Sequence, residues 1–473
     1  SSNTVYDMAQ DNDGFIWMGA AYGLCRYDGY SFVNYLSLSS DKNRNIDANI
    51  GNIHCDSSNR LLWIHTATLT FACYDLTAGR FVDYTRRGDE NRTYRRFIKN
   101  GSDLWMYDDR SGIRHVSCQG GNFKCTDYTV QNGRLPGSHI PRMVADGKGN
   151  VWAATDNGLL RIDRQGRLTT IAKGQRYKEA NTYRGDIVCL TESNTVEIYS
   201  PDGKKAKSFK IPSAVGNVNA IKSNFVWRGR WMLFCKDTYQ VDLNTGVTTK
   251  PDGVQVPNGL LLDTADGYHF ESNSSGTLWV FTPEGEVKTL KLLPDVKFTT
   301  DRMRRYTVRR GPHGLFYIAT FGNGLFVYDH RSGALRHYSA NDPQPVIDSN
   351  FLTTMFIDRD GTLWVAQDMM GVACISVADQ SIADFVLPAK GHKGDWANNV
   401  KMIAKRSDGK TIFSTRDNKI YALDAEMGQA TLLYETKACA YSYITDSRGR
   451  EWMATRGDGL YVDGTGYNKG DRR

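Results

Sequence analysis

The sequence lacks the features that would place it in a membrane, on a nucleic acid or in a helical class. Its 473 residues contain no run of 18 apolar residues, so no segment resembles a membrane-spanning helix. The net charge of +7 is small and spread along the chain, which argues against nucleic acid and is compatible with an acidic ligand. Proline numbers only 12, and helical periodicity is absent. The 45 glycines, 25 tyrosines, 19 phenylalanines and 10 tryptophans instead indicate short strands separated by tight turns.

Residues that build metal and cofactor sites are present but not grouped. The nine cysteines include no Cys-x-x-Cys pair, and no two of the nine histidines have metal-ligand spacing on one strand. We therefore expect no metal and no cofactor. Cys118 and Cys125 flank the sequence QGGNFK, and a two-residue turn at Gly121-Asn122 would place them opposite each other on a hairpin. A disulfide between them is one alternative, and two buried free thiols are the other.

An internal repeat is the main signal in the sequence. Residues 11–28 read DNDGFIWMGAAYGLCRYD, and residues 146–163 read DGKGNVWAATDNGLLRID. The shared pattern is Asp-x-x-Gly, two residues, an aromatic residue, a short apolar run and then Gly-Leu. Asp-x-x-Gly is typical of a tight turn between two strands, and the aromatic ring is expected to pack against a neighbouring unit. With a degenerate unit at Cys189, the aromatic positions recur every 37 to 49 residues, which predicts one four-stranded blade per unit.

Eleven such units predict an all-β protein of the β-propeller class, built from four-stranded antiparallel blades. A ring usually closes with four to eight blades, so eleven blades in one ring are not expected. We predict a seven-bladed propeller over residues 1–297, followed by part of a second propeller, about four blades, over residues 298–473. The joint is expected near KLLPDVKFTTD at 291–301. The four strands of the first blade are predicted at about 4–10, 15–20, 24–28 and 31–36.

The segment DNDGFIWMGAAYGLCRYDGYSF at 11–32 resembles the two-component regulator propeller repeat, and SSNTVYDMAQ at 1–10 resembles the first blade of the sensors that carry it. Those sensors are the periplasmic domains of hybrid two-component systems of gut Bacteroidetes. The resemblance implies a periplasmic ligand-sensing domain that binds an oligosaccharide and controls glycan-utilisation genes through a histidine kinase. It also implies a membrane helix and a homodimer in the full-length receptor. Because residue 1 already lies in a strand-like pattern, we expect the chain to be a segment of a longer protein.

Arginine and tyrosine gather in two segments that we expect to connect one blade to the next, RRGDENRTYRRF at 86–97 and KGQRYKEANTYR at 173–184. Guanidinium forks bind carboxylate or sulfate groups, and aromatic rings stack on the apolar faces of sugars. We therefore predict a site for an oligosaccharide, and the arginines favour an acidic oligosaccharide as its ligand. Its predicted residues are Arg92, Tyr94, Arg95, Arg96, Tyr183 and Arg184. The alternative is that these residues are solvated loop charges or pack between the two propellers.

Two other function classes stay open. A propeller-type polysaccharide lyase or glycoside hydrolase needs positioned carboxylates, whereas most aspartates here belong to the repeated turns. A protein-interaction scaffold of the WD or kelch kind would show recurrent Gly-His and Trp-Asp dipeptides or paired glycines, which do not recur here. We assign no catalytic residue and expect a binding domain rather than an enzyme.

Overall fold

The structure is a computed structural model, and it confirms the all-β propeller class. In the described residues the strands form eleven antiparallel sheets, of which ten have four strands and one has three. The count equals the eleven repeat units in the sequence. No helix in this part of the chain is long and apolar enough to cross a membrane. The structure describes residues 4–35, 49–85, 92–215, 221, 223–235, 237–254, 259–264, 267–272, 276–292, 306–376, 399–424 and 429–468.

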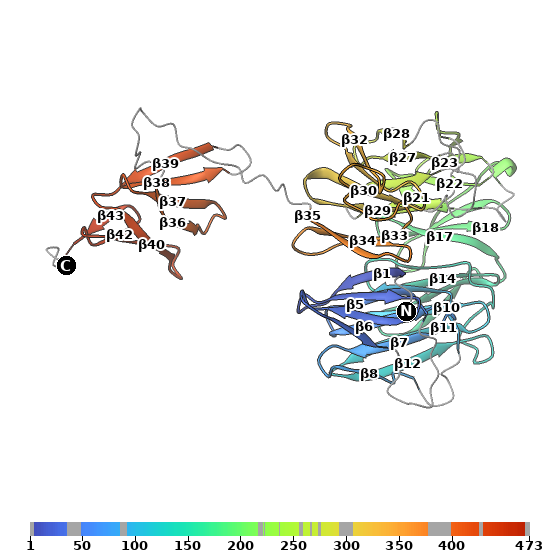
Figure 1. Cartoon of the computed structure of the whole chain (residues 1–473). Helices are drawn as coiled ribbons and strands as arrows, with labels where there is room; N and C mark the ends of the chain where they lie inside the picture. The colour runs from blue at the N-terminus through green and yellow to red at the C-terminus, as the bar shows by residue number, and fades with distance from the viewer. Residues whose placement is uncertain are drawn as a thin grey trace. The chain divides into compact units, whose positions relative to one another are not determined.

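The sheets are numbered along the chain, and in each one consecutive strands pair as a meander (Figure 1). Sheet 1 contains β1 (Val5–Gln10), β2 (Ile16–Ala20), β3 (Gly23–Tyr27) and β4 (Phe32–Tyr35). Sheet 2 contains β5 (Ile50–Asp56), β6 (Leu61–Thr66), β7 (Phe71–Asp75) and β8 (Arg80–Val82). Sheet 3 contains β9 (Arg96–Asn100), β10 (Asp103–Asp108), β11 (Gly112–Gln119) and β12 (Asn122–Tyr128). Sheet 4 contains β13 (Arg142–Ala145), β14 (Val151–Thr155), β15 (Gly158–Ile162) and β16 (Leu168–Ile171).

The next four sheets repeat this order. Sheet 5 contains β17 (Tyr177–Tyr183), β18 (Asp186–Thr191), β19 (Thr195–Tyr199) and β20 (Lys205–Lys210). Sheet 6 contains β21 (Ser223–Trp227), β22 (Arg230–Phe234), β23 (Thr238–Asp242) and β24 (Thr248–Thr249). Sheet 7 contains β25 (Gly259–Asp263), β26 (His269–Ser272), β27 (Thr277–Phe281) and β28 (Val287–Lys291). Sheet 8 contains β29 (Tyr306–Arg310), β30 (Leu315–Thr320), β31 (Leu325–Asp329) and β32 (Leu335–Tyr338).

The last three sheets complete the described chain. Sheet 9 has three strands, β33 (Leu352–Ile357), β34 (Thr362–Gln367) and β35 (Gly371–Ser376). Sheet 10 contains β36 (Val400–Lys405), β37 (Thr411–Thr415), β38 (Lys419–Asp424) and β39 (Gln429–Glu435). Sheet 11 contains β40 (Ala440–Thr445), β41 (Glu451–Thr455), β42 (Leu460–Val462) and β43 (Thr465–Tyr467). Two 3-10 turns, Ser213–Val215 and Pro312–Gly314, are the helical elements in the described residues.

The repeated aspartate explains why the first two strands of a sheet form a hairpin. In sheet 4, Oδ1 of Asp146 accepts the backbone N–H groups of Lys148 at 2.8 Å and Asn150 at 3.1 Å. Its other oxygen, Oδ2, accepts the indole Nε1–H of Trp152 at 3.2 Å. Gly149 has a φ of 89°, a backbone conformation that glycine adopts without strain. The motif therefore closes the turn and orients the tryptophan, which is fully buried, in a single local step.

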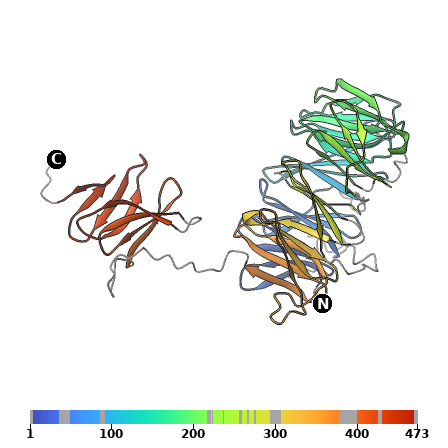
Figure 2. The ribbon, with the colours of Figure 1, turned by 90° about the horizontal axis from the view of Figure 1, so that it is seen from above.

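The core lies between neighbouring sheets, which pack face to face. Each of nine apolar clusters joins two sheets: consecutive sheets from the first to the ninth, and finally the ninth to the first. In the last cluster, Met8 and Met18 pack with Trp364 and Ala366. Figure 2 shows the blue first sheet beside the orange ninth sheet. Thr4 Oγ1 also donates a 3.0 Å hydrogen bond to Oδ1 of Asp368, 364 residues away in the sequence.

The division of the chain differs from the expected one. The contacts group Ser1–Ala378 as one unit with nine sheets and Asp379–Arg473 as another with two, whereas we expected seven and four with the division at residues 297 and 298. The reason is that one apolar cluster, which includes Phe270 and Phe316, packs sheet 7 against sheet 8 across the expected joint. The second unit has its own small core, in which Ile420, Ala440 and Met453 are buried.

Candidate functional site

The hairpins that join the first and second strands of the sheets lie at one edge of the first unit, which we call the turn edge. The segments that connect one sheet to the next lie at the opposite edge, which we call the connection edge. This assignment follows from the meander order, because the first strand of each sheet runs from a connection to a hairpin. Residues at opposite edges therefore do not belong to one site for a ligand that approaches from outside.

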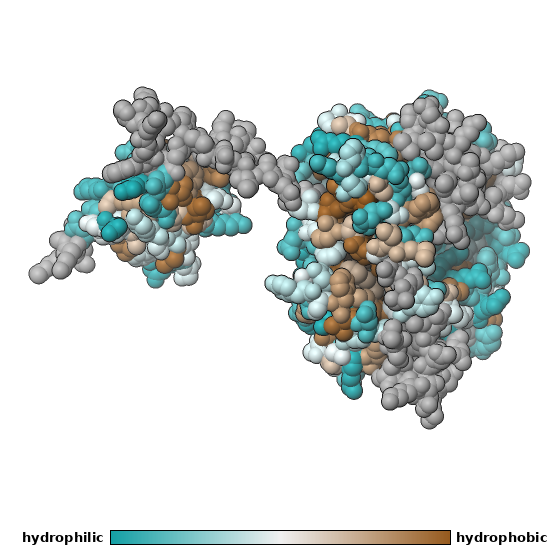
Figure 3. All heavy atoms as spheres, in the orientation of Figure 1, coloured by the Kyte–Doolittle hydropathy of each residue, from teal (hydrophilic) through white to brown (hydrophobic). Residues whose placement is uncertain are grey.

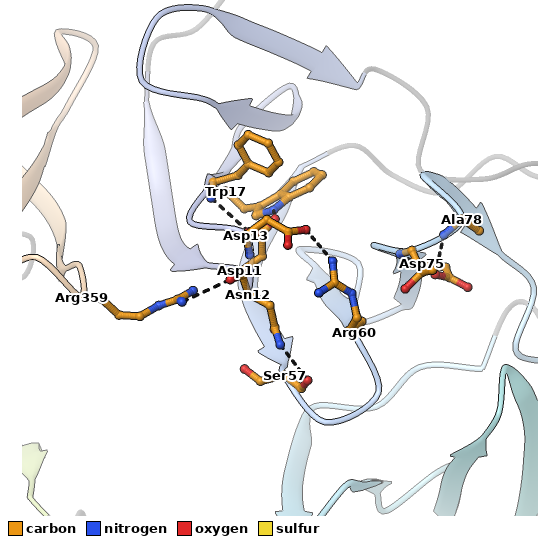
Figure 4. Close-up of polar contacts among 11 residues, drawn as sticks. Asp11, Asn12, Asp13, Trp17, Ser57, Arg60, Asp75, Ala78 and Arg359 are labelled. Carbon is orange, nitrogen blue, oxygen red and sulfur yellow. Dashed lines mark hydrogen bonds and ion pairs between the residues drawn. The ribbon is translucent and has the colours of Figure 1, made fainter. Parts of the chain in front are cut away.

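Hydrogen bonds link the hairpins along the turn edge (Figure 4). Nη1 of Arg359, in sheet 9, donates to the carbonyl of Asn12 in sheet 1 at 3.3 Å. Nδ2 of Asn12 donates to the carbonyl of Ser57 in sheet 2 at 3.1 Å. Nη2 of Arg60 returns from sheet 2 to Oδ2 of Asp13 at 2.5 Å. Three sheets are thus held in register at this edge by side chains of the turns themselves.

An open pocket of about 390 Å³ lies at the same edge, where the first strands of sheets 9, 1 and 2 run side by side. We call it the turn-edge pocket. Its volume falls within the roughly 300 to 1,000 Å³ that is usual for small-molecule sites. It is lined by residues 8–10 of β1, 53–55 of β5, and 356–359 at the end of β33 and in the turn that follows. It is therefore assembled from three segments that are remote from one another in the sequence.

The polar groups of the turn-edge pocket belong to Gln10, His54, Cys55, Asp358 and Arg359. Nε2 of His54 is buried and has no hydrogen-bond partner among the described residues. Burial, followed by the charge of Lys99, lowers the pKa of His54 to about 4, so the imidazole is neutral near pH 7. Gln10 Oε1 accepts the backbone N–H of Arg359 at 2.9 Å, which fixes the start of that turn. The Arg359 side chain is exposed.

The structure does not bring the six predicted ligand residues together. Arg92, Tyr94, Arg95 and Arg96 precede or begin β9 and lie at the connection edge. Tyr183 and Arg184 instead end β17 and start the hairpin to β18, so they lie at the turn edge. The six residues therefore lie at two different edges, because residues 177–183 form the first strand of sheet 5 rather than a connection between sheets. Cζ of Arg184 lies 5.2 Å from the ring centroid of Tyr183.

The residues at the connection edge are mostly committed to contacts within the protein. Nη1 of Arg92 donates to Oδ2 of Asp127 at 3.0 Å, and Nη1 of Arg96 donates to the carbonyl of Pro141 at 2.5 Å. The Tyr94 side chain is buried, and burial raises its pKa to about 12. Arg95 is exposed, with 67% of its side chain accessible.

A small cavity at the connection edge involves Arg95 and Arg96, together with Asp108 and Asp109. It measures about 30 Å³, which is room for about one water molecule and not for a sugar ring. Nε of Arg95 lies 3.5 Å from Oδ2 of Asp108, so part of the positive charge is neutralised by the protein itself. In the described residues this group forms a charged surface rather than a pocket.

The expected alignment of Cys118 and Cys125 is also corrected by the structure. Cys118 pairs with Phe123, and Cys125 pairs with Val116, because the turn falls at Gly120-Gly121 and not at Gly121-Asn122. Both cysteines are free thiols, and Sγ of Cys125 donates to the carbonyl of Tyr84 at 2.9 Å. The two thus behave as the second alternative, small residues within an apolar cluster between sheets 2 and 3.

Groups suited to metal binding are not assembled in the described residues. No three His, Cys, Asp or Glu side chains there are grouped as metal ligands. A buried acid occurs away from the pocket: Ser223 Oγ donates to Oε1 of Glu271 at 2.6 Å, and burial raises the pKa of Glu271 to about 8. This carboxyl is fully buried, so a substrate does not reach it. The chemistry available at the turn-edge pocket is hydrogen bonding and charge pairing.

Sequence reasoning missed His54 and Arg359. Arg359 follows the turn aspartate in Asp-Arg-Asp-Gly, whereas the corresponding residue of the first repeat is Asn12. The equivalent residues of the other turns are small, Asn12, Gly147 and Ser447, so an arginine at this position could have been recognised as a candidate binding residue. His54 gave no comparable signal, because its neighbours across the pocket come from β1 and from the turn after β33.

Comparison with known proteins supports the resemblance seen in the sequence. Residues 1–22 match the family model described as the two component regulator propeller, so the recognition of this repeat is confirmed there. Among curated proteins, none matches this sequence.

The chain is similar to several solved structures. One is the extracellular domain of the hybrid two component system BT3049 from B. thetaiotaomicron, with 14% identity, 98% of this chain and 69% of that chain covered, and a TM-score of 0.34. Another is the extracellular domain of the one component system BT4673 from B. thetaiotaomicron, with 17% identity, 98% and 70% covered, and a TM-score of 0.35. A third is the computationally designed Ika8 protein, with 12% identity, 80% and 97% covered, and a TM-score of 0.44.

Proposed function

We propose that this chain is the extracytoplasmic ligand-sensing domain of a two-component sensor and that it binds an oligosaccharide without converting it. The observation that carries the proposal is the two component regulator propeller repeat at residues 1–22. The same Asp-x-x-Gly and aromatic pattern recurs at residues 146–152, 358–364 and 446–452, and the chain forms eleven sheets. The output, control of glycan-utilisation genes through a histidine kinase and a dimeric receptor, follows from the family resemblance.

The first unit suits a sensor because its packing is continuous. Every sheet from the first to the ninth shares an apolar cluster with the next, and the ninth shares one with the first. A ligand that bridges two or three sheets at the turn edge would therefore act on a framework whose sheets do not move independently. Sensing needs such a coupling between the ligand and the relative positions of the elements it touches.

The proposal is tested by calorimetry of the purified chain against a library of neutral, uronic and sulfated oligosaccharides, with the ligand recovered and analysed afterwards. Binding of one glycan class with the ligand recovered intact supports the sensor. Recovery of cleaved glycan would contradict it in favour of a lyase or hydrolase. If no saccharide binds and a protein partner co-purifies, the chain is instead an interaction scaffold.

The connection edge is tested in the same experiment. Replacing Arg95 and Arg96 together by alanine removes the charged surface there, and unchanged affinity would remove this edge from the proposed site. Loss of affinity without a change in the melting temperature would retain Arg95 and Arg96 as ligand contacts. Because Arg96 also contacts the carbonyl of Pro141, the melting temperature must be measured alongside the affinity.

A further inference from the structure

Asp358 lines the turn-edge pocket and Asp11 lies next to the lining residue Gln10, and the carboxylates of both are hydrogen-bonded by their own turns. Asp358 Oδ1 accepts the N–H groups of Asp360 at 3.0 Å and Thr362 at 2.8 Å, and its Oδ2 accepts the indole N–H of Trp364 at 2.8 Å. The carboxylate of Asp11 is bound in the same way in the neighbouring sheet. These acids keep their negative charge, but their hydrogen bonds are directed into the protein, and among the described residues neither forms an ion pair with Arg359.

The guanidinium of Arg359 is left with free capacity. Its one hydrogen bond to a described residue runs from Nη1 to the carbonyl of Asn12, at 3.3 Å, and no described carboxylate forms an ion pair with it. A guanidinium has five N–H donors in a planar fork that matches a carboxylate. The bond to Asn12 orients the side chain along the turn edge while most of its donors stay available (Figure 4). The pocket therefore offers an oriented guanidinium with free donors, beside the hydrogen-bonded carboxylate of Asp358.

The rest of the pocket suits the body of a sugar rather than a bare ion. Met8, Ala9 and Ile53 are buried apolar residues, and Phe356 and Ile357 are partly exposed. His54 is neutral and can donate or accept a hydrogen bond from a hydroxyl group. Apolar surface, a neutral hydrogen-bonding group and a cation together match a ring that has apolar C–H faces, hydroxyl groups and one acid. Figure 3 shows patches of apolar side chains among polar ones on the visible face of the first unit.

We propose that the turn-edge pocket binds a mono- or disaccharide unit that carries a carboxylate, with Arg359 as the residue that pairs with the acid. The apolar residues of β1, β5 and β33 contact the ring, and His54 bonds a hydroxyl group. This proposal deepens the proposed function, on which it rests, by naming the ligand class and the residues. It places the site at the edge opposite to Arg95 and Arg96.

The test is calorimetric titration of the chain with glucuronate and galacturonate, as monosaccharides and disaccharides, and with the methyl esters of the same sugars. We expect at least one free acid to bind and its ester to bind about 10- to 100-fold more weakly, since a charge-assisted hydrogen bond is lost. Arg359→Gln is expected to weaken the binding of the free acid by a similar factor and to leave the affinity for the ester unchanged. The esters probe the charge with the unaltered protein, so the test does not depend on the variant folding.

The matched control is Arg164→Gln. Arg164 also follows the aspartate of an Asp-Arg-x-Gly turn and is also exposed, but it belongs to sheet 4 and lies outside the pocket. We expect it to bind the uronates as the unaltered chain does. Equal weakening by both variants would indicate a general charge effect and would overturn the assignment to Arg359.

The remaining outcomes separate this inference from the proposed function. If a neutral saccharide binds while every uronate fails, or if the free acid and its ester bind equally, the inference is overturned and the sensor proposal stands. If no saccharide of the library binds at all, both are overturned.

Discussion

The indole Nε1 of Trp17 donates a 2.7 Å hydrogen bond to Oδ2 of Asp11, six residues earlier in the chain. Oδ1 of the same aspartate accepts the backbone N–H groups of Asp13 and Phe15. One carboxylate thus closes the hairpin and fixes the ring that fills the space between two sheets. The same set of contacts recurs at Asp146, Asp358 and Asp446.

Removing one of these carboxylates should destabilise the first unit. In Asp146→Ala, two backbone N–H groups and the fully buried indole of Trp152 lose their acceptor, so we expect a loss of about 3 kcal/mol in the free energy of unfolding. Urea denaturation followed by tryptophan fluorescence measures it. Asp202→Ala, at an exposed turn, is the control and should change stability by less than about 0.5 kcal/mol. Equal effects of the two substitutions would contradict the role assigned to the motif.

A buried arginine should not tolerate replacement by lysine. Arg114 is 1% exposed, and its Nε and Nη2 donate to the two oxygens of Asp127 at 2.7 and 2.9 Å. Lysine keeps the charge but cannot form this fork, so Arg114→Lys should cost about 2 kcal/mol. The exposed Arg110, in the same sheet, gives the control Arg110→Lys, which should be neutral. The comparison is made by thermal and urea unfolding, and a neutral Arg114→Lys would show that charge alone is sufficient there.

The free energy of unfolding should decrease as pH rises, because of Glu271. Burial raises the pKa of this carboxyl to about 8 in the folded protein from an ordinary value of 4.5. Between these two pH values the folded state therefore keeps a proton that the unfolded state releases. The stability that this proton contributes is lost as pH rises from about 4.5 to about 8. The slope should approach roughly 1.4 kcal/mol per pH unit within this window.

The measurement is the free energy of urea unfolding at intervals from pH 5 to pH 8, for the unaltered chain and for Glu271→Gln. Glutamine resembles the protonated acid, so the difference between the two proteins should change by the expected slope. A difference that stays constant with pH would show that Glu271 is not protonated preferentially in the folded state.

The nine cysteines should behave as free thiols of unequal reactivity. Cys374 is exposed, whereas Cys189 is fully buried and burial raises its pKa. In native buffer we expect iodoacetamide to label Cys374 first and to leave Cys189 unmodified, with all nine labelled after denaturation without reductant. Mass spectrometry of the labelled chain provides the count. Two unlabelled cysteines at 118 and 125 in the denatured, unreduced chain would restore the disulfide alternative.

The strands of a blade were predictable because they depend on neighbours in sequence. The predicted strand at 4–10 is β1 (Val5–Gln10), and the one at 15–20 is β2 (Ile16–Ala20). The alternation of apolar residues and the Asp-x-x-Gly turn act within about 20 residues, so both can be read directly. Turn positions were less secure: at Gly120-Gly121 two adjacent glycines allowed either of two registers, and a shift of one residue moved the partner of Cys118 by two.

The sequence determined the class of fold, the number of sheets and the job of each turn aspartate, since these rest on hydrogen bonds and periodicity within one repeat of about 40 residues. The tertiary structure decided which sheets share a unit and which edge carries each loop. The turn-edge pocket exists because sheet 9 packs against sheet 1, so that Arg359 lies beside Gln10 and the pocket extends to His54. Every blade presents similar apolar faces to its neighbours, and no single repeat determines which sheet packs against sheet 1 to close the ring. That choice depends on the sum of the packing angles between sheets.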